Sequence, residues 1–391
     1  MAIDNVILVE EGDIQLYIPR LNENVSPLKS PVFYNLRMQL SRDVSVIALQ
    51  AYQRISAVGL HVCDAMSGCG VRGIRYAVEV KGVEQVDLND LNPLAVDLMK
   101  KNVEINNVGQ RSVIHNYETN HLLAMYAEPG SRFDVVDIDP FGSPSPYLDT
   151  LIRATKKGGL IMITATDLAP LSGVHPMACQ RKYGGRPLNT EYVQETAIRL
   201  VVSALVRSAA VHSMAFHPLL CYYQDYYVRV IGTISYGSKI AAASLKNIGF
   251  ILHCNKCLNR ETVKGNCPVK KECSRCGQKL EHAGPLWLGD LFDGLFLSQM
   301  ELILPERSYK SINRIRRLIT DSKEEVTLPP TYFLLDSLCD KLGLPLPKPV
   351  HVKGILVEQG YKAGRSHIHG NAIKTDAPID VLEDAVRKVL S

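Results

Sequence analysis

The sequence predicts an α/β fold in which a mostly parallel sheet ends in an antiparallel hairpin. Strand-like apolar runs alternate with helical patterns between residues 60 and 164, which is the pattern of βαβ units. A glycine-rich turn at 68–73 follows the first of these runs. Two later runs, 214–223 and 226–235, are joined by only two residues, so they must pair antiparallel. We therefore expect five parallel strands completed by this hairpin.

The individual elements follow from local patterns in chain order. A strand is expected at 14–18, and a helix is expected from Ser41, whose hydroxyl can cap the first turn. Apolar residues then recur at helical spacing, at Val44, Ile47, Ala48, Ala51 and Ile55. The parallel strands are expected at 60–64, 85–89, 111–115, 134–139 and 160–164, with helices between them at 71–80, from 93, around 120–126 and at 147–156. Gly158-Gly159 is expected to end the last of these helices, and a helix from 190 to about 212 leads into the hairpin.

Length and composition indicate an ordinary globular protein with two domains. The chain has 391 residues, of which 46% are hydrophobic and 21% charged. We expect a first domain at 1–240, which carries an N-terminal arm, and a second domain at 241–391. The formal net charge of +4 is too small to indicate nucleic-acid binding by itself. The start of the chain does not resemble a secretory signal and no apolar run reaches about 18 residues, so we expect a cytoplasmic protein without a membrane partner. Its oligomeric state is left open, with a monomer favoured.

A cofactor-binding turn is predicted where the first parallel strand ends. Asp64 closes that strand, and Gly68 and Gly70 let the backbone approach a ligand closely. Asp90 follows Gly70 by 20 residues, at the end of the next strand, where a carboxylate can accept hydrogen bonds from both hydroxyls of an adenosine ribose. This pattern fits a nicotinamide dinucleotide or S-adenosylmethionine. The antiparallel hairpin favours S-adenosylmethionine.

Three further residues are expected at the same pocket from their positions. Glu118 follows the third strand and can accept a hydrogen bond from the adenine amino group. Arg42, at the start of a helix, and Arg72, after the glycine turn, can meet the cofactor's carboxylate. A solvated arm and a charge on a helix face explain the two arginines equally well.

A reactive corner is predicted at Asp139-Pro140-Phe141-Gly142, directly after a buried strand. Taken alone, a turn-forming Asp explains this pattern as well as a functional one. An exocyclic amine on a base is a poor nucleophile, because its lone pair is delocalised into the ring. Asp139 can accept a hydrogen bond and then the proton, and the Pro140 carbonyl can accept the second hydrogen. Phe141, with Phe33 from the N-terminal arm, offers a ring to a base drawn out of its stack.

Several motifs resemble the tRNA (guanine-26-N2) dimethyltransferase family. They are Ser30-Pro31-Val32-Phe33-Tyr34-Asn35, Asp139-Pro140-Phe141-Gly142-Ser143-Pro144, Ala165-Thr166-Asp167-Leu168-Ala169-Pro170-Leu171 and the C-terminal stretches 360–367 and 370–378. The resemblance covers nearly the whole chain. It implies that the guanine amino group at position 26 of tRNA is methylated once or twice, with S-adenosylmethionine as donor.

The resemblance also implies roles for individual residues. It makes Asp139 the catalytic carboxylate, Phe33 and Phe141 the contacts to the base, and four residues cofactor-binding, namely Arg42, Arg72, Asp90 and Glu118. Two positions depart from the family pattern. Glu118 stands where members often carry Asp, and Ser67-Gly68-Cys69-Gly70 is richer in glycine than the Ser-Ala-Thr-Gly of some members.

Two Cys-x-x-Cys pairs predict a structural zinc site within an insert at 250–282. Cys254 and Cys257 are separated from Cys273 and Cys276 by 15 residues, the spacing of four-thiolate zinc sites. Bound zinc can order a small insert that lacks a core of its own. Cys267 lies between the pairs and could replace one ligand.

Basic residues in the second half indicate contacts to tRNA. The segment from 307 to 317 contains no acid and has one apolar side, so it predicts a phosphate-contacting helix, although a solvated helix face fits nearly as well. Helices followed by a basic hairpin at 361–375 suggest a winged-helix-like end at 330–378. The expected tRNA contacts are Arg307, Lys310, Arg314, Arg316, Arg317, Arg365 and Lys374.

Three alternatives to this function were compatible with parts of the sequence. Another nucleic-acid amino methyltransferase, acting on adenine N6, would use the same Asp-Pro-aromatic turn. The glycine pattern also suits an NAD-dependent dehydrogenase. The cysteines and basic residues also suit a zinc-containing RNA-binding protein without catalytic activity.

Overall fold

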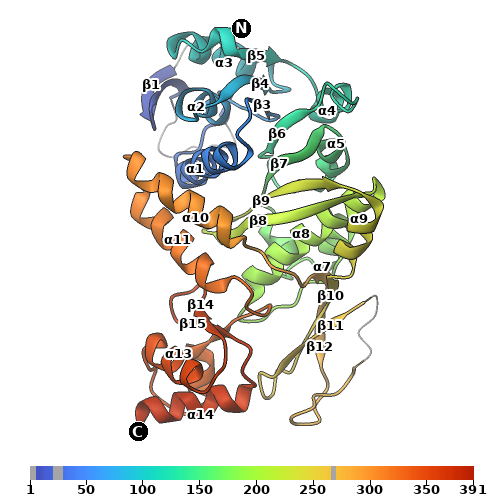
Figure 1. Cartoon of the computed structure of the whole chain (residues 1–391), viewed down its shortest axis with the longest axis vertical. Helices are drawn as coiled ribbons and strands as arrows, with labels where there is room; N and C mark the ends of the chain where they lie inside the picture. The colour runs from blue at the N-terminus through green and yellow to red at the C-terminus, as the bar shows by residue number, and fades with distance from the viewer. Residues whose placement is uncertain (1–5, 21–29, 266–269) are drawn as a thin grey trace.

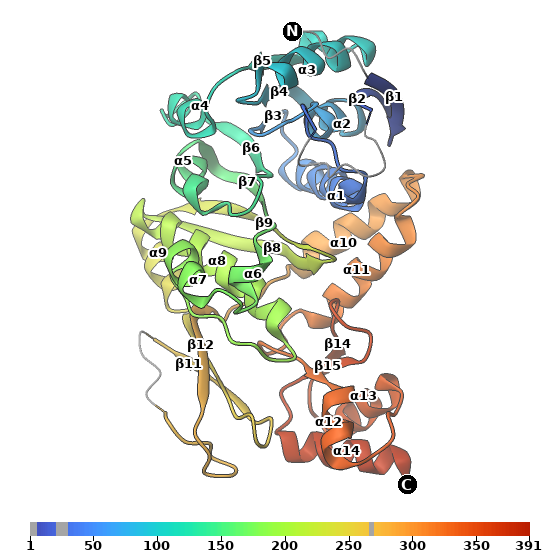
Figure 2. The ribbon, with the colours of Figure 1, turned by 180° about the vertical axis from the view of Figure 1, so that it is seen from behind.

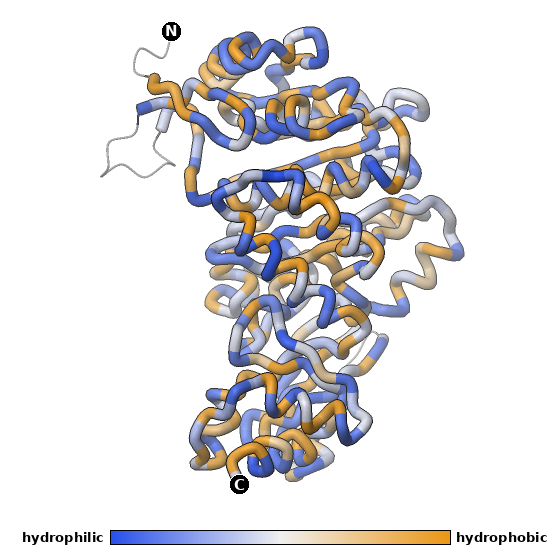
Figure 3. Tube along the Cα trace, turned by 60° about the vertical axis from the view of Figure 1, so that its left-hand side comes forward, coloured by the Kyte–Doolittle hydropathy of each residue, from blue (hydrophilic) through white to orange (hydrophobic). Residues whose placement is uncertain are grey.

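The computed structural model describes residues 6–20, 30–265 and 270–391. The molecule is elongated, with a large α/β body at one end and two smaller units at the other (Figure 1). Helices α10 (Gly294–Ile303) and α11 (Ile312–Glu325) run along one side and connect the large body to the C-terminal unit (Figures 1 and 2). Hydrophobic residues occur along the trace in both regions (Figure 3).

The large body is built on a seven-stranded sheet in the order β5-β4-β3-β6-β7-β9-β8. Five strands are parallel, as predicted: β3 (Leu60–Asp64), β4 (Val83–Asn89), β5 (Ser112–His115), β6 (Phe133–Ile138) and β7 (Thr155–Ala165). The predicted hairpin is β8 (Met214–Gln224) with β9 (Tyr227–Tyr236), and β9 pairs antiparallel with β7. The predicted fold class is therefore confirmed.

Helices follow the strands along the chain. They are α1 (Gln39–Ser56), α2 (Val71–Glu79), α3 (Pro93–Ile105), α4 (Thr119–Met125), α5 (Leu148–Arg153), α6 (Leu168–Leu171), α7 (Pro176–Tyr183), α8 (Val193–Val211) and α9 (Ser238–Leu245). An N-terminal hairpin, β1 (Val6–Glu11) with β2 (Ile14–Pro19), packs beside them. In α3 the Asn92 side chain accepts from the amide of Leu94, which is the N-cap that Asn-Pro predicts.

Two local predictions were wrong. Ser41 does not cap α1, because the helix begins at Gln39 and Ser41 is buried in its first turn. Gly158 and Gly159 do not end a helix, because α5 stops at Arg153 and both glycines lie within β7. The chain there enters the sheet early, since Thr155 already pairs with Phe133, and the glycines fall where the register shifts.

The second half contains two small sheets. The cysteine insert is a three-stranded antiparallel sheet of β10 (Ile248–His253), β11 (Arg260–Lys264) and β12 (Glu281–Trp287). The C-terminal unit combines β13 (Phe333–Leu334), β14 (Ala363–Arg365) and β15 (Ala372–Thr375) with α12 (Leu335–Leu342), α13 (Pro349–Glu358) and α14 (Ile379–Leu390). The basic hairpin expected at 361–375 is formed by β14 and β15.

The main hydrophobic core continues across residue 240. It joins buried residues of α1 to Phe296, Leu297 and Met300 of α10, and α10 packs against α1. Polar contacts fasten the same junction. The Ser311 hydroxyl bonds the buried Asp43 of α1, and Arg307 donates to the Glu79 carbonyl at the end of α2 (2.6 Å). The helices that precede the C-terminal unit therefore belong physically to the large body.

Within the three described ranges, no helix has both the length and the hydrophobicity needed to span a membrane.

Candidate active site

Four polar residues lie where the central parallel strands end. Asp64 is the last residue of β3, Asp90 follows β4, Asp139 follows β6 and Thr166 follows β7. The strands β4, β3, β6 and β7 are neighbours in the sheet, so these residues share one edge. This is the edge at which open α/β sheets bind ligands.

The glycine turn between β3 and α2 is held open by backbone conformation and by Asp90. Gly68 has a φ of +56°, and a Cβ there would lie 3.0 Å from the carbonyl oxygen of Phe33. The Gly68 amide donates to Asp90 Oδ2 (2.8 Å), and the Asn92 amide donates to Oδ1 of the same carboxylate (2.9 Å). Gly70, with a φ of +85°, begins α2. The turn and the N-terminus of α3 are thus fixed by one carboxylate.

Asp64 is buried beneath this turn. Its Oδ2 accepts from the Gly73 amide (2.9 Å) in the first turn of α2. Burial and the nearby Asp137 raise the pKa of Asp64 to about 7, although Arg72 and the Gly73 amide act in the opposite direction. The side chain is therefore a structural support under the cofactor turn, and its charge changes near neutral pH.

The Asp139 carboxylate is held from behind by Arg72. The Arg72 Nη2 donates to Asp139 Oδ2 at 2.6 Å, and its Nη1 donates to the Ser45 hydroxyl at 3.1 Å. Arg72 is buried, with 4% of its side chain exposed, while 21% of the Asp139 side chain is exposed. One carboxylate oxygen is therefore fixed by a buried cation while the group still reaches the surface.

Arg72 belongs to a buried polar cluster that we call the Arg229 cluster, made of Ser45, Arg72, Tyr76, Asp137, Thr164 and Arg229. Arg229 contacts Asp137 with two hydrogen bonds of 2.8 Å, and Tyr76 donates to the same carboxylate at 2.6 Å. Arg229 also donates to Thr164 and Ser45, both at 2.9 Å. Burial raises the pKa of Asp137, but Arg229 and Arg72 outweigh this effect, so the pKa is lowered overall and the carboxyl is ionised.

Arg229 was not among the predicted site residues. The signal available in the sequence was a single arginine inside the apolar run Tyr227-Val228-Arg229-Val230-Ile231 of a central strand. A buried arginine requires an anionic partner, so such a position predicts a carboxylate on a neighbouring strand. The sequence could not identify that partner.

The turn after Asp139 presents an aromatic corner. Gly142, with a φ of +89°, donates its amide to the Thr166 hydroxyl (2.8 Å), and its carbonyl accepts from the Thr166 amide (2.9 Å). Pro140 is buried, whereas Phe141 is 64% exposed. The rings of Phe33 and Phe141 meet edge to face, with centroids 4.5 Å apart. The structure thus brings the two predicted base-contacting residues together, beside Asp139.

Comparison with known proteins identifies the family. Residues 12–387 match the model of the N2,N2-dimethylguanosine tRNA methyltransferase family. The chain belongs to this family. It is 37% identical over 385 residues to the tRNA (guanine(26)-N(2))-dimethyltransferase of Methanothermobacter thermautotrophicus, covering 97% of this chain and 98% of that relative.

Further relatives agree with this membership. A tRNA (guanine(26)-N(2)/guanine(27)-N(2))-dimethyltransferase of Aquifex aeolicus is 33% identical over 372 residues, covering 94% of this chain and 93% of the relative. The solved structure of Trm1 from Pyrococcus horikoshii with S-adenosyl-L-methionine matches with a TM-score of 0.86 and 33% identity, covering 97% and 99% of the two chains. The expected resemblance is therefore confirmed over almost the whole length, and these matches favour neither the dehydrogenase nor the non-catalytic RNA-binding protein.

Arg42 and Glu118, like Asp64, Arg72 and Asp90, already have protein partners. The buried Arg42 forms two hydrogen bonds of 2.5 Å with Glu11 and one of 3.1 Å with the Asn35 carbonyl. Glu118 caps α4 by accepting from the His121 amide at 3.0 Å. Arg42 therefore braces the N-terminal hairpin and the arm in this structure, and the roles of both residues toward a cofactor stay predictions.

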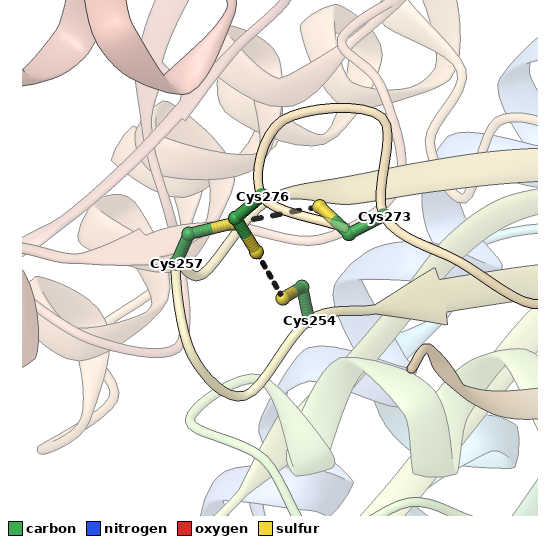
Figure 4. Close-up of side chains that lie close together, drawn as sticks. All are labelled: Cys254, Cys257, Cys273 and Cys276. Carbon is green, nitrogen blue, oxygen red and sulfur yellow. Dashed lines mark hydrogen bonds between the residues drawn. The ribbon is translucent and has the colours of Figure 1, made fainter. Parts of the chain in front are cut away.

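The four predicted metal ligands converge from two loops (Figure 4). Cys254 Sγ lies 3.4 Å from Cys276 Sγ, Cys257 Sγ lies 3.5 Å from Cys273 Sγ, and all four sulfurs lie within 4.8 Å of one another. Tetrahedral zinc with Zn–S bonds of about 2.3 Å separates its sulfurs by about 3.8 Å. The cluster fits a zinc ion in size and in ligand type, and Cys267 lies outside the described residues.

The predicted tRNA contacts fall into two groups. Lys310, Arg314, Arg316, Arg317 and Arg365 are exposed. Arg307 is half-buried and donates to the Glu79 carbonyl, so its guanidinium supports the junction between the halves of the chain. Only the exposed group is placed to meet phosphates.

Lys374 must be removed from the predicted tRNA contacts. Only 2% of its side chain is exposed, and its Nζ contacts Glu195 Oε1 of α8 (2.9 Å) and Glu325 Oε2 of α11 (2.8 Å). Glu325 also accepts from Nδ1 of the buried His367 ring (2.6 Å). A buried ammonium between two carboxylates is not available to a phosphate. We call these four residues the Lys374 cluster; it fastens the C-terminal unit to the large body.

Proposed function

We propose that this chain transfers one or two methyl groups from S-adenosylmethionine to the exocyclic N2 of guanine 26 in tRNA. The observation that supports this most directly is the Asp139 carboxylate, fixed by Arg72 at the edge of the sheet beside the glycine turn and the Phe33–Phe141 corner. Membership of the N2,N2-dimethylguanosine tRNA methyltransferase family favours guanine N2 over adenine N6.

Asp139 acts on the amine. When S-adenosylmethionine is bound it supplies an electrophilic methyl group. The free oxygen of Asp139 accepts a hydrogen bond from N2, and the Pro140 carbonyl accepts the other amine hydrogen, which turns the nitrogen lone pair out of conjugation. When N2 takes up a methyl group, its proton would pass to the Asp139 carboxylate. Arg72 keeps this carboxylate oriented throughout.

The aromatic corner holds the target base. Phe141 is exposed, and its ring packs edge to face with that of Phe33. A guanine inside an RNA stem cannot reach Asp139 without leaving its stack, and stacking on an aromatic ring offsets part of that cost. Gly142 and Thr166 hold the turn, so the ring is presented by a rigid backbone.

The cofactor side is assigned to Asp64, Gly68, Gly70 and Asp90, with Arg42, Arg72 and Glu118 as further contacts. Asp90 is placed at the end of β4 to accept from the ribose hydroxyls, in addition to the amides that it already binds. We assign methyl transfer to residues 1–240, whose core is completed by α10, and tRNA binding chiefly to 241–391, with the exposed cations of α11 and Arg365 at phosphates. The four cysteines Cys254, Cys257, Cys273 and Cys276 are assigned to a structural zinc ion.

Replacing Asp139 by Ala tests the reaction. We expect methyl transfer to fall by at least about 10²-fold, the usual contribution of a positioned acid or base, with cofactor affinity changed less than about threefold. Methylated tRNA is digested to nucleosides to identify the product and its position, and cofactor binding is measured by calorimetry.

The control is Asp97→Ala, which removes an exposed carboxylate of α3 whose partner is Lys100. Its methyl transfer should match that of the unmodified chain. An Asp139→Ala variant that retains activity would remove Asp139 from the mechanism. Methylation of a base other than guanine 26 would refute the proposed substrate.

A further inference from the structure

A pocket of about 380 Å³ lies between the tip of the β8–β9 hairpin, α11 and the loop that leads to β15. Its walls include Tyr223 of the hairpin, Leu318 of α11 and Ile368 of the loop. The volume lies within the range of small-molecule sites, about 300–1,000 Å³. None of the residues assigned above to the base or the cofactor lines it.

This pocket opens on the same edge of the sheet as Asp139. Val228 of β9 pairs with Ala165 at the carboxyl end of β7, and the hairpin tip extends beyond that pair. The tip also touches the arm that carries Phe33, because Asn35 donates to the Tyr226 hydroxyl at 3.1 Å. Tyr226 therefore connects the hairpin tip, which lines the pocket, to the arm that carries Phe33.

The lining has the chemistry that recognises a nucleotide. Tyr223 offers an aromatic face, and Leu318 and Ile368 offer apolar contacts. Gln194 and His369 supply hydrogen-bonding groups suited to the edge of a base. Arg314 and Arg317 line the pocket one helical turn apart and are exposed.

Both arginines at the pocket have exposed guanidinium groups that an anion can reach. Arg314 pairs with Asp225 at 3.1 Å, with both side chains about half exposed, and Arg317, 67% exposed, pairs with the buried Asp321 at 3.3 Å. The exposed ion pair contributes little to stability, so a phosphate can replace Asp225 at small cost. A phosphate at these arginines places its own base against Tyr223.

We propose that this pocket binds a second, unpaired nucleotide of the tRNA substrate, with its base on Tyr223 and its phosphate at Arg314 and Arg317. The inference rests on the proposed function, because it names a further part of the same substrate. Such a site binds an unpaired nucleotide that lies at a fixed distance from the target guanine. It selects tRNA by shape as well as by the base that is methylated.

A coupling experiment tests this proposal. A series of substrate tRNAs is prepared, each with one unpaired position made abasic. The kcat/KM of methyl transfer is measured with each tRNA for the unmodified chain and for Tyr223→Ala. We expect one abasic position to lower kcat/KM about tenfold or more with the unmodified chain. With Tyr223→Ala, the same abasic position should lower kcat/KM less than twofold, because the variant already lacks the ring on which the base stacks.

Two further variants keep the result interpretable. Arg316→Gln removes an exposed arginine of α11 that does not line the pocket, so it should weaken tRNA binding and still show the full abasic effect. Ile368→Trp fills the pocket and should reproduce the insensitivity of Tyr223→Ala; circular dichroism checks that both variants fold.

Three results separate the possible failures. If an abasic position and Tyr223→Ala lower kcat/KM additively at every position tested, the nucleotide site is overturned. Weaker binding by Arg317→Gln with no coupling at Tyr223 would also overturn it, by showing a phosphate contact alone. Absence of methyl transfer to guanine 26 by the unmodified chain would instead refute the proposed function.

Discussion

Replacing Lys374 by Met tests whether this lysine holds the chain together or holds tRNA. Met has nearly the same volume as Lys, so the change removes the charge and leaves the packing. In the structure it leaves Glu195 and Glu325 buried and without their shared cation, with 1% and 0% of their side chains exposed. Removal of one partner from a buried ion pair costs about 3–5 kcal/mol.

The pKa of Glu325 gives an independent magnitude. Burial raises this pKa, but Lys374 and His367 outweigh burial and bring it from 4.5 to about 2. At about 1.4 kcal/mol per pH unit, that difference corresponds to roughly 3 kcal/mol, which Lys374 and His367 supply together. Because the folded pKa is lowered, the stabilisation is fully present above about pH 4.5 and is lost as the pH falls from 4.5 toward 2.

Urea unfolding followed by the fluorescence of Trp287, the single tryptophan, measures this loss. We expect Lys374→Met to lose at most about 3–5 kcal/mol at pH 7, because Arg199 still pairs with Glu195 and His367 still contacts Glu325. The loss should be smaller at pH 4, where carboxyls that have lost the lysine take up protons. Adding Glu325→Gln to Lys374→Met should recover about 1 kcal/mol or more, because it removes one of the two buried charges.

The control is Lys362→Met, an exposed lysine before β14 in the same hairpin, which should change stability by less than about 0.5 kcal/mol. A loss below about 1 kcal/mol for Lys374→Met, together with weaker tRNA binding, would refute the buried cluster and return Lys374 to the tRNA surface.

Three further outcomes are expected. Arg229→Lys keeps the charge but loses the paired contact to Asp137, so kcat should fall about tenfold while cofactor affinity stays within twofold; an unchanged kcat in steady-state kinetics would contradict a role of the Arg229 cluster in positioning Asp139. Metal analysis should find one zinc per chain, and Cys273→Ser should remove it and lower the melting temperature, whereas a chain purified without chelators and free of zinc would rule out the metal site. Neutralising Arg314 and Arg316 together should lower the slope of log affinity for tRNA against log salt by about 2, and an unchanged slope would indicate a merely solvated helix face.

The features that the sequence predicted are those set by local pattern. The strand from Leu60 to Asp64 was predicted at its observed bounds, because a buried parallel strand is a short apolar run followed by a turn. The two residues between β8 and β9 fixed their antiparallel pairing. The Cys-x-x-Cys pairs predicted a cluster because each pair already places two thiols on one loop.

Features that depend on distant partners were not predictable. Lys374 has the composition of a surface lysine, and only the fold shows that Glu195, far away in sequence, faces it. Arg229 and Asp137 lie on strands separated by β7 in the sheet, so their pairing depends on strand order as well as on residue type. The early start of β7 was missed because its glycines satisfy the rule for the end of a helix equally well.

The core that crosses residue 240 has a consequence for synthesis on the ribosome. The sheet of the large body is encoded before α10, but α10 packs against α1, and Tyr309 and Ser311 in the segment after α10 add hydrogen bonds to Glu79 and Asp43. A nascent chain that has emerged only to residue 240 exposes the apolar face of α1, although Asp43 and Glu79 keep their ion pairs with Arg75. Complete packing of the large body therefore requires α10 to emerge, and a chain cut after residue 240 lacks part of its own core.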